Sequence, residues 1–133
     1  FRKVYKSAKA IDDNTPDEFI HDLRIECKKL RYLMEFFSSL FPAQDISQLI
    51  KQLKVFQTFL GDFNDLSVQQ EYILAKLEKV KLSKIGLKNS ASFGGLLTYM
   101  FQQQKKLRKL FYQEFSKFNT KENINLYKTL FAE

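Results

Sequence analysis

Apolar residues recur at helical spacing along most of the chain, and no useful length alternates with a period of two. The clearest segment follows the start signal "TPDE" at residues 15–18. In this signal Thr15 can cap a helix, Pro16 fits the first helical position and Glu18 closes a capping box. One apolar face then continues to Pro42, where we expect the helix to end; it consists of Phe19, Leu23, Cys27, Leu30, Met34, Phe37 and Phe41.

The same spacing predicts further helices over residues 1–11, 45–60, 65–80, 90–118 and 121–131. In "LGDFNDL" we expect Gly61 to end one helix and Asn64 or Asp65 to cap the next. Residues 81–90 are expected to form a loop. The later helices should bury Val68, Tyr72, Leu74, Ala75, Leu77, Phe93, Leu96, Leu97, Met100, Leu107, Phe111 and Phe115. We therefore predict an all-α fold, with residues 1–133 forming a single antiparallel four-helix bundle.

Four potential cations lie in a line beside the apolar face of the first long helix: His21, Arg24, Lys28 and Arg31. Their spacing places them within about 80° on a helical wheel. No acid interrupts the line, because Asp22 and Glu26 lie off it, and Glu35 is placed further along to pair with Arg31. Several cations on a rigid scaffold beside an apolar wall suit a polyanion. The alternative is that their stems merely cover the margin of the core.

Composition narrows the function further. The 22 Lys and Arg residues exceed the 15 acids, giving a net charge of +7, which favours nucleic acid, anionic membrane or phosphate polymers as partners. A single cysteine excludes an intramolecular disulfide and favours a reducing compartment, so we expect a cytoplasmic protein. No apolar run approaches the ~20 residues of a membrane span, and no signal peptide is visible, so we expect no membrane partner.

Catalytic and metal-binding chemistry has little support in this sequence. His21 and Cys27 share one helix, with Cys27 on its apolar face, which disfavours a Cys–His nucleophile pair. Zinc lacks ligands, no glycine-rich phosphate loop is present, and Asp62, Asn64 and Asp65 lack the spacing of a calcium loop. We therefore expect a protein that is not an enzyme and needs no metal or cofactor.

The segment "HDLRIECKKLRYLMEFF" at residues 21–37, followed by "FLGDFNDL" at 59–66, resembles the CHAD family, the conserved histidine α-helical domain. The first family motif is matched by His21, Arg24, Lys28, Arg31 and Tyr32. The second motif, Q-x-x-L-G-x-x-N-D, is matched by Gln57, Leu60, Gly61, Asn64 and Asp65. The best match extends over about residues 15–118 and resembles the C-terminal half of the domain.

The resemblance implies two helical bundles related by a pseudo-repeat, each giving a histidine-containing basic helix to a central basic cavity. It also implies binding of inorganic polyphosphate, with either the missing first half of the domain or a second copy as partner. Association with polyphosphate granules in the cytoplasm would follow from the same ligand.

Four further residues flank apolar faces and could line the same concavity: Lys54, Gln57, Lys105 and Arg108. For each of them, a solvated surface position is the alternative. Two classes of function therefore remain: a polyphosphate-binding module that uses the basic line, and a structural or adaptor bundle that docks an acidic protein. Nucleic-acid binding is third, because most phenylalanines fall on core faces rather than among exposed basic residues.

Overall fold

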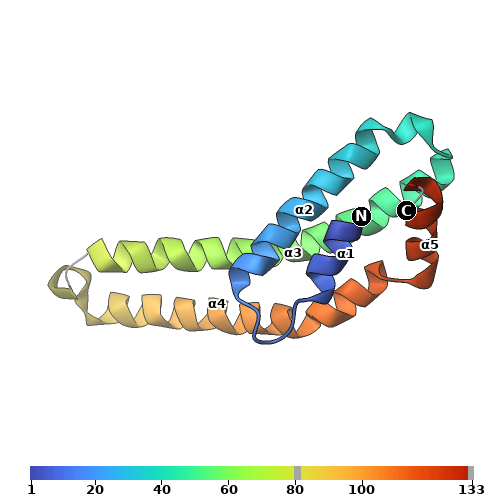
Figure 1. Cartoon of the computed structure of the whole chain (residues 1–133). Helices are drawn as coiled ribbons and strands as arrows, with labels where there is room; N and C mark the ends of the chain where they lie inside the picture. Colours follow the sequence, from blue (N-terminus) through green and yellow to red (C-terminus); the bar gives the residue numbers. More distant parts are fainter. Residues whose placement is uncertain (80–81, 132–133) are drawn as a thin grey trace. The chain divides into compact units, whose positions relative to one another are not determined.

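The computed structural model describes residues 1–79 and 82–131, and every regular element among them is helical (Figure 1). The elements are α1 (Arg2–Lys9), α2 (Asp17–Phe36), the 3₁₀ helix η1 (Ser38–Leu40), α3 (Ala43–Lys79), α4 (Leu82–Phe118) and α5 (Lys121–Phe131). The predicted all-α class is confirmed, and the antiparallel four-helix bundle stays a prediction. Within these ranges no helix combines the length and the apolar character that crossing a membrane requires.

The chain divides into two compact units. The first consists of residues 1–61 and 110–133, and the second of residues 62–109. The core of the first unit draws buried side chains from all five α-helices, including Val4, Ala8, Leu23, Cys27, Met34, Leu53, Phe56, Leu60, Phe115 and Tyr127. Aromatic rings pack at its centre, where Phe56 stacks on Phe118 with 5.5 Å between ring centroids. This core holds α2 and the start of α3 in place.

Helix α2 begins one residue later than the sequence predicts. Pro16 has an extended conformation (φ −57°, ψ 147°) and occupies the capping position, so Asp17 is the first helical residue. The Thr15 hydroxyl oxygen accepts a hydrogen bond from the Asp12 backbone N–H at 2.9 Å and donates one to Asp12 Oδ1 at 3.0 Å. Two acidic side chains in the first turn, Asp17 and Glu18, interact favourably with the helix dipole.

The predicted apolar face of α2 is confirmed at Leu23, Cys27 and Met34, which are at most 1% exposed. It is wrong at Phe19 and Phe37, which are 52% and 42% exposed. Phe37 lies outside the last helical turn, so its side chain leaves the face. Phe19 lines an open cavity instead of packing into the core.

Helix α3 continues through the segment "LGDFNDL", so the predicted break at Gly61 and the predicted caps at Asn64 or Asp65 are wrong. Glycine inside a helix costs roughly 0.5–1 kcal/mol relative to alanine, which a helix held by packing can tolerate. Of the predicted loop, residues 82–90 belong to α4, and Lys81 lies outside the described residues. A non-helical residue interrupts α4 at Gly86, where φ is 73°.

In the second unit, a polar contact joins α3 to α4. The buried side chain of Gln104 donates a hydrogen bond to Ser67 and accepts one of 3.0 Å from Gln70 Nε2. Several positions that the sequence places inward are 39–64% exposed, and those predictions are wrong: Val68, Tyr72, Leu74, Phe93 and Leu96. Two paired helices bury only the strip along which they meet, so a wide apolar face stays partly uncovered.

Candidate anion-binding site

The basic stripe, defined as His21, Arg24, Lys28 and Arg31, lies on α2. Because α2 is continuous over these positions, the four side chains follow one another along one side of the helix. The two arginines are half-buried, and the histidine and the lysine are exposed. The neighbouring Leu23 and Cys27 are fully buried, so the stripe lies along the margin of the core.

Helix α3 runs antiparallel to α2 beside this stripe, as two contacts at different levels show. At one level, Glu35 Oε1 lies 3.8 Å from Arg31 Nε and 3.6 Å from Lys54 Nζ. At the other level, a Cβ placed on Gly61 would lie 3.7 Å from Arg24 Nε. Arg31, at the end of the stripe, therefore lies at the level of Lys54. Arg24, nearer the start of the stripe, lies at the level of Gly61, which follows Lys54 in α3.

Gln57 lies between these two levels, because it follows Lys54 by one helical turn and precedes Gly61 by another. Its Oε1 atom is buried and has no hydrogen-bond partner among the described residues. Lys54, by contrast, is exposed, with 55% of its side chain accessible. The structure thus brings two of the predicted flanking residues, Lys54 and Gln57, next to the stripe.

Tyr32 keeps two cations of the stripe close to one aromatic ring. Its centroid lies 5.7 Å from Lys28 Nζ and 5.0 Å from Arg31 Cζ. Both distances are within the range of cation–π attraction. Because the ring is half exposed, it places the two charges at the surface while limiting the freedom of their side chains.

The two arginines present guanidinium groups that are only partly used within the fold. Arg24 Nε and Arg31 Nε are buried and have no hydrogen-bond acceptor among the described residues. The 3.8 Å contact with Glu35 confirms the predicted pairing of Arg31, although the distance is longer than a charge-assisted hydrogen bond. A forked guanidinium in this state suits the oxygen atoms of a phosphate.

The other two predicted residues, Lys105 and Arg108, belong to the second unit, and their part in the site stays a prediction. Lys105 Nζ lies 5.1 Å from the ring centroid of Phe101, and Arg108 is half-buried.

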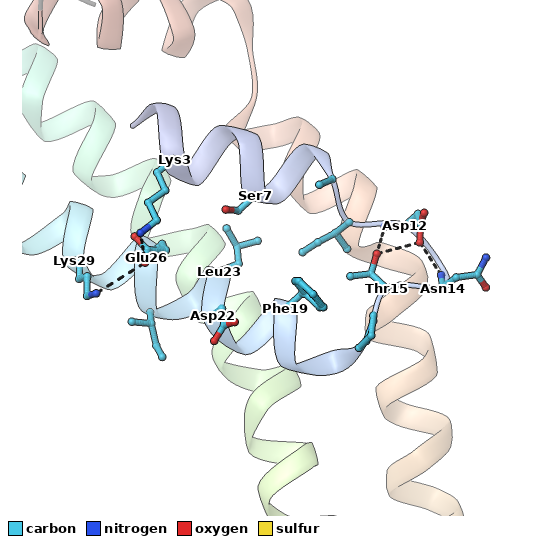
Figure 2. A pocket seen from close by; sticks show the side chains of 14 residues that line it. Lys3, Ser7, Asp12, Asn14, Thr15, Phe19, Asp22, Leu23, Glu26 and Lys29 are labelled. Carbon is cyan, nitrogen blue, oxygen red and sulfur yellow. Dashed lines mark hydrogen bonds and ion pairs between the residues drawn. The ribbon is translucent and has the colours of Figure 1, made fainter.

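A cavity of about 930 Å³ lies between α1 and the opposite side of α2, shown in Figure 2. Its lining includes Phe19, Asp22 and Glu26, and none of the stripe residues. Glu26 Oε1 lies 3.2 Å from Lys3 Nζ and 3.9 Å from Lys29 Nζ. This cavity is therefore separate from the basic stripe, and sequence reasoning did not find it.

Burial controls the chemistry of the single cysteine. It raises the pKa of the Cys27 thiol to about 12, with a further contribution from Glu26. Burial likewise raises the pKa of Tyr127, with a smaller contribution from Cys27. A thiol that stays protonated at neutral pH is a poor nucleophile.

Sequence reasoning missed two features of the site. The first is that Glu35 contacts cations of two helices, Arg31 of α2 and Lys54 of α3. Helical spacing predicts the contact with Arg31, but it cannot show that Lys54 approaches from α3. The second is the place of Gly61 against Arg24. The second motif contained a signal for it, a glycine four residues after Gln57, but that glycine also fits a helix end.

The family model of the CHAD domain matches residues 1–74, more than half of the 133 residues. This range contains the basic stripe, Lys54, Gln57 and Gly61. No curated protein matches the chain.

Proposed function

Because the chain belongs to the CHAD-domain family, we propose that it is a binding module for inorganic polyphosphate. The CHAD domain is linked to polyphosphate binding. The observation that carries the proposal for this chain is the basic stripe on α2, flanked by Lys54 of α3.

The length of the stripe favours a polymer over a single phosphate ion. A helix rises 1.5 Å per residue, so His21 and Arg31 are about 15 Å apart along the axis. A linear polyanion lying along α2, over the stripe and beside Lys54, would meet the stripe residues in succession. Hydrogen bonds to charged groups are worth roughly 1.5–3 kcal/mol each, so a few phosphate contacts give useful affinity. Binding should weaken steeply with salt because it releases counterions.

We also propose that this module is not an enzyme. The sequence has one cysteine and one histidine, and the cysteine is buried with a raised pKa. Cys27 is therefore unsuited to nucleophilic attack, and the stripe is better suited to holding a ligand than to transferring a group.

The other function considered, an adaptor bundle docking an acidic protein, would use the same cations. Large apolar side chains at the end of α2 and in η1 favour it, since Leu33, Phe36 and Leu40 are 57–80% exposed. A protein partner would cover both the cations and these exposed apolar side chains, whereas a phosphate polymer would contact only the cations. Binding of polyphosphate that is unaffected by Phe36→Asp would favour the polymer.

Three finer expectations also belong to this proposal. The chain would correspond to the C-terminal half of the CHAD domain. A first half or a second copy of this chain would then complete the central basic cavity that the family resemblance implies. Light scattering after size-exclusion chromatography would distinguish a monomer from a dimer. A cytoplasmic location, with association with polyphosphate granules, stays a prediction.

The proposal is tested by reversing charges on and off the stripe. Arg24→Glu/Arg31→Glu should abolish polyphosphate binding, because it places two acids in the line. The matched control is Lys6→Glu/Lys29→Glu, which changes the net charge equally at two exposed positions away from the stripe. Circular dichroism checks that both variants remain helical. If the stripe variant binds as tightly as the control, the assignment of the stripe is wrong.

A further inference from the structure

Glu35 contacts one cation of the stripe on α2 and one flanking cation on α3. Its Oε1 atom lies between Arg31 Nε of α2 and Lys54 Nζ of α3, at 3.8 Å and 3.6 Å. A single carboxylate oxygen that faces two cations holds the position a phosphate oxygen would take between them.

Both contacts are weak enough to be exchanged for a ligand. Arg31 Nε has no hydrogen-bond acceptor among the described residues, so its contact with Glu35 is an ion pair without a hydrogen bond. Glu35 is 40% exposed and Lys54 is 55% exposed, and ion pairs in such surroundings contribute little. A phosphate oxygen could approach both cations to hydrogen-bond distance, which is shorter than the present contacts.

We propose that Glu35 is an internal competitor for the phosphate ligand: its carboxylate occupies the Arg31–Lys54 end of the site, and binding of the polymer displaces it. The inference rests on the proposed function. It adds a determinant of selectivity, because the tethered carboxylate is present at a high effective concentration. A single small anion cannot compete well at this end, whereas a polymer already held by the rest of the stripe can.

The test is the affinity of Glu35→Gln for long-chain polyphosphate, measured by titration at fixed salt. We expect Glu35→Gln to bind about three- to tenfold more tightly than wild type, because the polymer no longer has to break one or two exposed ion pairs with Glu35. The matched control is Glu26→Gln, which also removes one acid that faces two cations, here Lys3 and Lys29, but on the other side of α2 (Figure 2). The control should change the affinity less than twofold.

A double-mutant cycle gives a second readout. Lys54→Gln should weaken binding more in the Glu35→Gln background than in wild type, because in wild type Lys54 must first leave Glu35. Lower affinity in Glu35→Gln would mean that the carboxylate positions the cations, and equal gains in Glu35→Gln and Glu26→Gln would mean a general charge effect. Either result overturns the inference.

The same experiment separates this inference from the proposed function. If Arg24→Glu/Arg31→Glu abolishes binding but Glu35→Gln leaves it unchanged, only the competitor role is wrong. If neither wild type nor Glu35→Gln binds polyphosphate, the proposed function is wrong and the inference is overturned with it.

Discussion

Replacing Gly61 tests the contact between α3 and the basic stripe and separates folding from binding. Gly61 lies inside a continuous helix, where alanine is favoured over glycine by roughly 0.5–1 kcal/mol. The added Cβ would meet Arg24 Nε at 3.7 Å, an ordinary contact, so no clash offsets this gain. We therefore expect Gly61→Ala to raise the free energy of unfolding by about 0.5–1 kcal/mol, or the melting temperature by about 2–4 °C.

A larger side chain at the same position should act on the ligand site instead. The atoms of Gly61→Leu beyond Cβ would extend toward the Arg24 guanidinium and displace it. If one charge-assisted contact with phosphate is lost, affinity should fall about tenfold to a hundredfold. Thermal unfolding measures the first variant and polyphosphate titration measures both, with Gly61→Ala expected to bind like wild type. Destabilisation by Gly61→Ala, or wild-type affinity in Gly61→Leu, would refute this reasoning.

Two further predictions concern buried groups. Folded Cys27 keeps its proton up to about pH 12, whereas an unfolded thiol loses its proton near its ordinary pKa of 9.0. The folded state therefore binds more protons above pH 9, and stability should fall with rising pH by up to about 1.4 kcal/mol per unit; denaturant unfolding of Cys27→Ala should lack this component. The Tyr127 hydroxyl is buried without a hydrogen-bond partner among the described residues, and its ring stacks on Phe1 with centroids 3.9 Å apart. Tyr127→Phe should thus leave stability within about 1 kcal/mol of wild type, and a loss above about 2 kcal/mol would reveal a hydrogen bond.

The all-α class and the buried face of α2 could be predicted from the sequence, because the apolar residues that recur at helical spacing in α2 are the ones that the fold buries. Leu23, Cys27 and Met34 recur at helical spacing and are buried. The same reasoning failed for Tyr72 and Phe93, which are exposed in the second unit. Apolar periodicity indicates which residues share a face, but whether that face is covered depends on how many helices pack against it.

The site was predictable along one helix but not across two. The spacing of Arg24 and Arg31 follows from the geometry of α2 alone. The contact of Lys54 with Glu35 depends on the register between α2 and α3. A local sequence pattern within one helix cannot predict that register. Gly61 was misinterpreted because a glycine before two possible caps resembles a helix end, whereas packing keeps α3 continuous there.

The most direct test of the central claim is a titration of the chain with long-chain polyphosphate over a series of salt concentrations, beside single-stranded DNA of matched charge. We expect tighter binding of polyphosphate at every salt concentration, a steep decrease with salt, and loss of this preference in Arg24→Glu/Arg31→Glu. Equal affinity for the two polymers, or a preference that persists in the double variant, would contradict it.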